Sequence, residues 1–211
     1  MTVPDALLAD AQTKLNAALA RWGGEQDLWL FGYASLIWKP EFDYAQRLDA
    51  RIHGWHRALC MWSRVYRGTP ECPGLVFGLL SGGSCHGQAF RVPAARGKQV
   101  LTQVWHREMV SDVYVPRWVT CQTAAGRVQA LAFTLPRDSP QYTGQLSDAQ
   151  YADVFSNAKG RFGSTLDYAS QTYQSLLTQG IDDRALKRLL RLVADSKNSD
   201  EIYGQIVGKP R

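Results

Sequence analysis

The order of β-rich and helical stretches is the strongest constraint that this sequence places on its fold. Short apolar stretches rich in β-branched and aromatic residues recur between residues 28 and 135, whereas residues 148–193 show the apolar spacing that is typical of helices. One helical pattern, centred on Val104, lies within the β-rich part. This order lacks the regular alternation of a doubly wound parallel sheet, so we expect an α+β domain built on a curled sheet or barrel.

Individual elements are predicted from apolar spacing and from glycine. Residues 5–22 form an amphipathic pattern that stops at a glycine pair, which predicts a helix, and residues 28–31 are apolar on both faces, which is typical of a central strand. Gly32 ends that strand in a turn that carries residues 33–38. The sequence Ser-Gly-Gly-Ser at residues 81–84 predicts a hairpin turn between two strands. Three further helices are expected at residues 148–158, 166–178 and 184–193.

The composition indicates one globular domain of ordinary core size. The 211 residues are 45% apolar and 20% charged, and no segment approaches the roughly 20 apolar residues needed to cross a bilayer. The first residues lack the basic and apolar segments of a secretory signal, so we expect a cytoplasmic protein that does not bind membranes. The net charge of +5 is spread along the chain, which argues against a nucleic-acid partner, and no obligate protein partner is evident.

Most common catalytic and cofactor motifs are missing from the sequence. There is no G-x-S-x-G nucleophile elbow, no phosphate-binding loop and no G-x-G-x-x-G pattern. Cys85 and His86 are adjacent in a predicted strand, where neighbouring side chains face opposite sides. His53 and His56 are three positions apart in another predicted strand, which is unfavourable for a shared metal ion. The four cysteines lack zinc-site spacing, and we expect reduced thiols.

Three places in the sequence carry residues with useful chemistry. The turn at residues 33–38 contains Tyr33 and Ser35, Arg67 precedes a glycine in a proline-rich loop, and Glu108 stands among apolar neighbours. A carboxylate in apolar surroundings has a raised pKa and can accept a proton near neutral pH. On the residues alone, the alternative is that Glu108 pairs with the adjacent arginine or caps a strand at the surface.

Short motifs that follow one another between residues 28 and 193 resemble those of the ChaC-like γ-glutamylcyclotransferases. Residues 31–40 (FGYASLIWKP) are similar to the family's G-Y-G-S-L-I-W signature, and residues 105–109 (WHREM) are similar to its R-E-M segment. The other matches are GWHR at 54–57, RGTPECPGL at 67–75, GGSCHGQAFRV at 82–92, GSTLDYASQTY at 163–173 and GIDD at 180–183. Each motif is weak alone, but their common order makes the resemblance specific.

This resemblance implies a small mixed β-barrel flanked by helices, and an enzyme that cleaves γ-glutamyl peptides, glutathione in particular. The implied partner is this small-molecule substrate, and no metal or organic cofactor is implied. The resemblance assigns the acid/base role to Glu108, and binding of the glutamyl group to a turn made of Tyr33, Ala34, Ser35, Leu36, Ile37 and Trp38. Arg67 and Tyr168 are further candidates for substrate binding, with a structural ion pair and core packing as the respective alternatives.

The resemblance also implies a division of the chain. Residues 27–195 would form the catalytic domain, with an N-terminal helix at residues 1–26 packed on it and a C-terminal extension at residues 196–211.

The implied chemistry needs few residues. The glutamyl α-amine attacks the γ-carbonyl of the same molecule, so 5-oxoproline closes and cysteinylglycine leaves without an enzyme nucleophile. Positioning of the substrate and a carboxylate that relays one proton supply the catalysis. Ala34 replaces the family's glycine, and its Cβ would disfavour a positive φ and narrow the approach of a ligand. Two alternatives stay open: an enzyme for other γ-glutamyl amines, and a noncatalytic γ-glutamyl-binding module.

Overall fold

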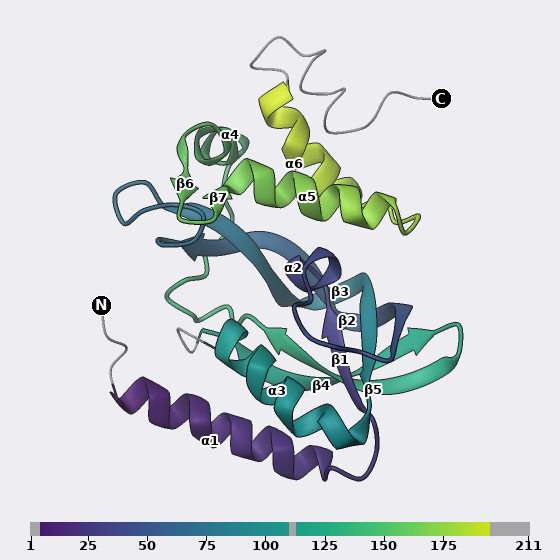
Figure 1. The fold of residues 1–211 in the computed structure, drawn as a ribbon. Coiled ribbons are helices and arrows are strands. Elements are labelled where there is room, and N and C mark those ends of the chain that lie inside the picture. Colours follow the sequence, from purple (N-terminus) through teal and green to yellow (C-terminus); the bar gives the residue numbers. More distant parts are fainter. Residues whose placement is uncertain (1–4, 110–112, 195–211) are drawn as a thin grey trace. The chain divides into compact units, whose positions relative to one another are not determined.

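The chain forms two compact units that are interleaved in sequence. The computed structural model describes residues 5–109 and 113–194 (Figure 1). The first unit contains the residues up to 56 together with residues 79–139, and the second contains residues 57–78 together with those from 140 onward. Two long strands, β2 (Gln46–Ser63) and β3 (Gly74–Val92), each run from one unit into the other. The chain therefore passes between the units three times, at residues 57, 79 and 140.

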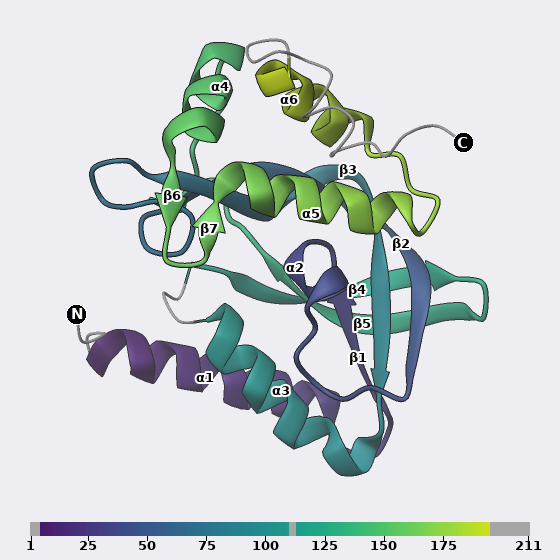
Figure 2. The same cartoon turned by 45° about the horizontal axis from the view of Figure 1, so that its top comes forward.

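A closed barrel with the strand order β1-β3-β2-β4-β5 organises the first unit (Figure 2). Its other strands are β1 (Leu28–Gly32), β4 (Val115–Thr123) and β5 (Gly126–Thr134). Leu30 of β1 pairs with Phe90 of the antiparallel β3 and with Leu131 of the parallel β5, and all three are at most 1% exposed. The expected curled sheet or barrel is thus confirmed, and so is its mixed strand direction.

Two helices of the first unit lie side by side. Helix α1 (Asp5–Trp22) has the predicted bounds, and helix α3 (Ala94–Glu108) is the one inserted among the strands (Figure 1). The indole Nε1 of Trp105 donates a 2.9 Å hydrogen bond to the carbonyl of Ala11. A Cβ added to Gly97 would lie 2.3 Å from the Trp22 ring, so a residue without a side chain is needed where the helices meet. The last turn of α3 holds Glu108, which makes its position important for the site.

The predicted hairpin at residues 81–84 is wrong. Strand β3 continues through this segment, although Gly82 and Gly83 have positive φ angles of 96° and 73°. The Nδ1 atom of His56 lies 2.8 Å from the carbonyl oxygen of Gly82, which ties the irregular stretch to β2. Two glycines with positive φ therefore make a local irregularity in one long strand, where sequence patterns suggested a chain reversal.

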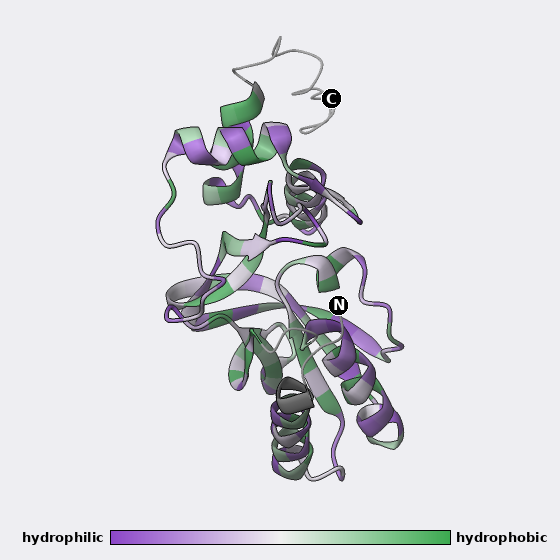
Figure 3. Cartoon of the chain, turned by 90° about the vertical axis from the view of Figure 1, so that its left-hand side faces the viewer, coloured by the Kyte–Doolittle hydropathy of each residue, from purple (hydrophilic) through white to green (hydrophobic). Residues whose placement is uncertain are grey.

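Three helices of the second unit pack against one another, and all three match the predicted ranges within one or two residues. They are α4 (Asp148–Asn157), α5 (Thr165–Leu177) and α6 (Arg184–Ala194). Capping boxes at Ser147 and Ser164 start α4 and α5. Polar and apolar residues alternate along the helical ribbons (Figure 3), as expected for helices that bury one face. Two short strands, β6 (Lys159–Gly160) and β7 (Gly163–Ser164), connect α4 to α5 and were not predicted.

A buried ion pair joins two of the sequence motifs within the second unit. Arg57, from the GWHR motif, binds the carboxylate of Asp183, from the GIDD motif, and the two side chains are 5% and 16% exposed. Asp183 also caps α6, because its other oxygen accepts a 3.0 Å bond from the N–H of Leu186. Arg57 and Asp183, one residue from each motif, are therefore accounted for by the structure of this unit.

Some sequence-based expectations concern the chain as a whole. No helix within residues 5–109 and 113–194 is long and apolar enough to cross a membrane. Cys60, Cys72, Cys85 and Cys121 are free thiols, as expected. The domain boundaries at residues 27 and 195 stay a prediction, and the proposed extension at residues 196–211 lies outside the described residues.

Candidate active site

The turn after β1 forms one helical turn, α2 (Ser35–Trp38), at the end of a barrel strand. The N–H of Ile37 bonds to the carbonyl of Ala34 at 2.9 Å, and the N–H of Lys39 bonds to that of Ser35 at 2.8 Å. A Cβ added to Gly32 would lie 2.9 Å from Cβ of Leu36. Glycine at this position therefore lets α2 pack back against the end of β1.

The side chains of the turn divide into buried and accessible ones. Tyr33, Ala34, Leu36 and Ile37 are between 2% and 8% exposed, so they belong to the core of the first unit. Ser35 is half-buried and presents a hydroxyl group at the start of α2. The first N–H groups of a helix have no partner inside that helix. Polar contact with a ligand at this turn is thus available from the Ser35 hydroxyl and from the backbone.

Ala34 does not have the positive φ that would call for a glycine. The φ angle of Ala34 is −140°, which is not the left-handed conformation that favours glycine. The concern that a Cβ would conflict with a positive φ therefore does not apply to this structure. Compared with the family's glycine, Ala34 adds only the volume of one methyl group. The residue is 8% exposed.

Glu108 is the last residue of α3, and its side chain is 17% exposed. Its Oε1 atom lies 3.2 Å from Nε of Arg107, and no other described residue forms a hydrogen bond or ion pair with this carboxylate. The pairing with Arg107 that the sequence left open is therefore present, but the pair is not at the open surface. One oxygen is held and the other is free of protein partners in the described part of the chain.

Electrostatics at Glu108 favour the protonated form more than for an ordinary glutamate. Burial raises the pKa of Glu108, and the positive charge of Arg107 acts in the opposite direction. The last turn of a helix also disfavours a negative charge, because its free carbonyl groups point there. A carboxylate in this position costs stability when ionised, and such groups are typical of catalytic acids and bases.

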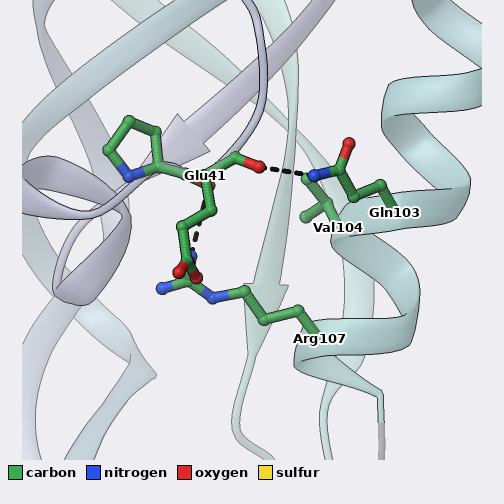
Figure 4. Close-up of a pocket in the computed structure, with 5 residues that line it drawn as sticks. Glu41, Gln103, Val104 and Arg107 are labelled. Carbon is green, nitrogen blue, oxygen red and sulfur yellow. Dashed lines mark hydrogen bonds and ion pairs between the residues drawn. The ribbon is translucent and has the colours of Figure 1, made fainter.

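Arg107 connects Glu108 to the turn and to the loop that follows it. Its Nη2 atom donates a 3.0 Å hydrogen bond to Oγ of Ser35, and its Nη1 atom lies 3.0 Å from Oε2 of Glu41. Gln103, one turn earlier on α3, donates a 2.5 Å bond to the carbonyl of Glu41. Figure 4 shows both side chains reaching from α3 toward Glu41. A cavity of about 320 Å³ is lined by Pro40, Glu41, Gln103, Val104 and Arg107.

Arg67 and Tyr168 lie together in the second unit. The guanidinium carbon of Arg67 is 4.7 Å from the centre of the Tyr168 ring, and its Nη1 atom donates to the carbonyl of Phe162. Burial lowers the pKa of Arg67, which stays positively charged. The backbone N–H of Arg67 also bonds to Oγ of Ser63 at 3.0 Å. Arg67 therefore makes a cation–π contact and a bond to a carbonyl, and no ion pair with Arg67 is found within residues 5–109 and 113–194.

Close packing explains the glycines of the RGTPECPGL motif. A Cβ on Gly68 would lie 2.0 Å from the backbone nitrogen of Gly74, and a Cβ on Gly74 would lie 2.1 Å from the carbonyl oxygen of Arg67. A Cβ on Gly160 would lie 2.5 Å from the nitrogen of Gly68. Three chain segments therefore cross at contact distance beside Arg67, and any side chain there would separate them.

The other candidate pairs do not assemble into sites. His53 lies 3.3 Å from Oε1 of Gln122, and His56 contacts a backbone carbonyl. Cys85 is buried whereas His86 is exposed, as expected for neighbours in a strand. Within the described residues, no group of three or more His, Cys, Asp and Glu side chains is arranged to hold a metal ion.

Comparison with solved structures identifies the class of fold. A crystal structure of a γ-glutamyl cyclotransferase specific to glutathione, from yeast, matches with a TM-score of 0.73 at 20% sequence identity. The match covers 84% of this chain and 100% of the yeast chain. The barrel and its helices therefore have the fold of a γ-glutamyl cyclotransferase.

Sequence comparison then identifies the family. The model of the family described as ChaC-like protein matches residues 28–196. The glutathione-specific γ-glutamylcyclotransferase of Escherichia coli (strain K12) is 33% identical over 192 residues, covering 89% of this chain and 83% of its own. Glutathione-specific γ-glutamylcyclotransferase 1 of Homo sapiens is 30% identical over 151 residues, covering 69% and 68%. The chain belongs to the ChaC-like family, which confirms the resemblance seen in its motifs.

Sequence reasoning underestimated Arg107. It considered this residue as a surface partner of Glu108, whereas the structure makes it the link between Glu108, Ser35 and Glu41. The signal was the R-E order within WHREM, which places a cation and an anion together in the last helical turn. Lys39 and Pro40 on the contacted loop close the FGYASLIWKP motif, whereas Glu41 lies one residue beyond it.

Proposed function

We propose that this protein is a glutathione-specific γ-glutamylcyclotransferase, which converts glutathione into 5-oxoproline and cysteinylglycine. The proposal is supported by the family membership of the chain and by the names of its relatives in Escherichia coli and Homo sapiens. A single observation within the structure carries it: a mostly buried carboxylate, Glu108, sits at the end of α3 with one oxygen held by Arg107.

The proposed reaction closes a ring within the substrate. The α-amine of the glutamyl group attacks the γ-carbonyl carbon of the same molecule, and a new C–N bond forms. Glu108 takes a proton from that amine and gives it to the nitrogen of cysteinylglycine as the old C–N bond breaks. Such a relay typically contributes about 10²- to 10⁴-fold in rate. Holding the substrate in the folded conformation supplies much of the remainder, since effective molarities of about 10⁵ to 10⁸ M are known for well-oriented intramolecular reactions.

The turn at residues 33–38 has the proposed task of holding the glutamyl group. The Ser35 hydroxyl and the first N–H groups of α2 are donors that suit a carboxylate or a developing oxyanion. Leu36 and Ile37 anchor the turn through their buried side chains. Binding therefore depends on where the barrel places this backbone more than on the side chains of the motif.

The remaining parts of the proposal rest on sequence. Substrate contact by Arg67, Tyr168 and Trp38 stays a prediction that substitution tests. The proposed substrate is a small molecule, with no nucleic acid, membrane or obligate protein partner, and the proposed location is the cytoplasm.

Incubation of the purified protein with glutathione tests the function. We expect 5-oxoproline and cysteinylglycine to appear in equal amounts, as measured by mass spectrometry. Other γ-glutamyl amines and γ-glutamyl amino acids, tested in parallel, show whether glutathione is preferred. Cleavage of those compounds without cleavage of glutathione would contradict the substrate assignment. Tight binding of glutathione without any product would identify a noncatalytic binding module instead.

A further inference from the structure

Arg107 is unusual in the number of protein groups that surround its guanidinium. All three nitrogens have acceptors: Nε faces Glu108, Nη2 faces Ser35, and Nη1 faces Glu41 and two backbone carbonyls. Those two carbonyls belong to Lys39 and Pro40, at 2.5 Å and 3.2 Å. The side chain is 23% exposed: its contacts with Ser35 and Glu108 are partly buried, whereas Glu41 is 50% exposed.

These existing hydrogen bonds limit which role the Arg107 guanidinium can have in the site. An arginine has five N–H donors in a rigid plane and no acceptor. Each of the three nitrogens already donates to the protein, and among the described residues only the second N–H of Nη2 has no acceptor. The guanidinium is therefore suited to hold protein groups in place, and the fixed directions of its donors set where those groups lie.

We propose that Arg107 is a positioning residue of this enzyme, which locks the Glu108 carboxylate and the Ser35 hydroxyl into one rigid arrangement. This inference rests on the proposed cyclisation reaction. Arg107 acts through its two partners and does not touch the substrate itself.

The contact with Ser35 has a directional consequence. Because the Ser35 oxygen accepts the bond from Nη2, its own hydrogen is left to donate. A donor hydroxyl suits the carboxylate of a glutamyl group, whereas an acceptor would oppose it. Arg107 thus selects the useful orientation of Ser35 at the opening of α2.

The contact with Glu108 restricts a carboxylate that would otherwise rotate. With Oε1 held at 3.2 Å, Oε2 keeps a fixed position for proton transfer. The other charged groups joined to this guanidinium directly or through a partner, within the described residues of the first unit, are Lys39 and Glu41 on the loop. Lys39 pairs with Glu41 at 2.9 Å, so the two loop charges largely compensate one another. The charge of Arg107 then favours the ionised form of Glu108, which lowers its pKa against the effect of burial.

The loop conformation shows that this arrangement is enforced. Glu41 has a φ angle of 56°, a left-handed conformation that is uncommon for a residue with a side chain. Such strained residues persist where the surroundings over-determine them, and they gather at functional sites. Here Arg107 binds the carboxylate of Glu41 while Gln103 binds its carbonyl. Arg107 therefore holds the loop on α3, and it also holds its two proposed partners in the site, Ser35 and Glu108.

Substitution of Arg107 by glutamine and by lysine tests the inference. For Arg107→Gln we expect kcat for glutathione to fall about 10- to 100-fold, since small misplacements of reacting groups have effects of this size. The acidic limb of the pH–rate profile should move to higher pH, because a positive charge beside Glu108 is lost. Arg107→Lys restores the charge without the planar fork, so it should return the limb toward wild type while kcat stays low. A role in folding alone would not restore the acidic limb in Arg107→Lys while kcat stays low.

The control is Arg96→Gln, the same substitution at another arginine of α3, which removes an exposed ion pair with Asp43 and leaves Ser35 and Glu108 untouched. We expect its kcat and pH profile to match those of the wild type. If the wild type cleaves glutathione and Arg107→Gln has the same kcat and the same acidic limb, the inference is overturned and the proposed function stays intact. A wild type that does not cleave glutathione would instead refute the proposed function. If neither Arg107 variant folds, as judged by circular dichroism, Arg107 is a structural residue and the inference is wrong.

Discussion

The hydroxyl of Tyr33 donates a 3.0 Å hydrogen bond to the carbonyl oxygen of Phe133. Phe133 lies in β5, and the two residues are 100 positions apart. The Tyr33 side chain is 7% exposed, so the bond is shielded from water. The first residue of the proposed glutamyl-binding turn is therefore bonded to the barrel, and its phenol anchors the turn in addition to any role toward a ligand.

We expect Tyr33→Phe to cost stability, because the substitution removes this bond and leaves a buried carbonyl without it. The loss should be about 1 kcal/mol in the free energy of unfolding, measured by urea denaturation. If the phenol also orients the glutamyl group, KM for glutathione will rise as well. An unchanged KM would limit Tyr33 to anchoring, and an unchanged midpoint of unfolding would contradict the anchoring role.

Glu108→Gln should abolish most activity and change how stability depends on pH. Because the pKa of Glu108 is raised on folding, the wild type is favoured at low pH and loses stability as pH rises through the folded-state pKa. The glutamine variant cannot ionise and lacks this loss. We therefore expect the variant to gain stability relative to wild type from about pH 4.3 upward, the ordinary glutamate pKa, in thermal unfolding at several pH values. A constant difference between the two proteins across pH 3–8 would show that Glu108 is not perturbed.

Ala34→Gly tests the departure from the family's signature. Because the φ of Ala34 is negative, glycine is not needed for a left-handed conformation, and we expect the variant to lose about 0.5–1 kcal/mol of stability through greater freedom of the unfolded chain. Removal of the methyl group widens the approach to the turn, and KM values for bulkier γ-glutamyl substrates should fall more than KM for glutathione. Equal changes for all substrates would argue against a role of Ala34 in specificity.

Arg67→Met separates structure from substrate binding in the second unit. The variant keeps an apolar stem against Tyr168 but loses the cation–π contact and the bond to Phe162. We expect a loss of about 1–3 kcal/mol in the free energy of unfolding. If Arg67 also contacts glutathione, KM will rise at a temperature where the variant is fully folded. An unchanged KM under that condition would assign Arg67 to structure alone.

The cysteines should differ in reactivity. Burial raises the pKa of Cys121 to about 12, and the residue is fully buried, so its thiolate is scarce at neutral pH. Cys72 is half-buried and should react first. Labelling with iodoacetamide, followed by peptide mass spectrometry, should find Cys72 modified in the native protein and Cys121 modified only after unfolding. Early labelling of Cys121 in the folded protein would contradict the described core.

Local patterns predicted the helices of this protein well. Helix α1 begins and ends where the apolar spacing and its glycine stop indicate, and Ser164 opens α5 through a capping box. These signals act within a few residues, so they can be seen in one sequence. The glycines at 82 and 83 were misread, because a positive φ serves an irregular strand as well as a turn.

The candidate site was predictable only in part, because local patterns do not show which distant residues come into contact. Motif order drew attention to Glu108 and to the turn, and the family match confirmed the motifs. The contacts of Arg107 with Ser35 and Glu41 join positions more than 60 residues apart, as do the contacts of Tyr33 with Phe133. Such contacts depend on closure of the barrel, which no local spacing encodes.

The interleaving of the two units has a consequence for dissection of this protein. A cleavage at residue 140 leaves the first unit joined to a foreign segment, residues 57–78, and deprives the second unit of that segment. Any single cut between residues 57 and 139 likewise separates segments that belong to the same unit. We therefore expect that neither contiguous half folds when it is expressed alone, and that the two units are always found together in one chain.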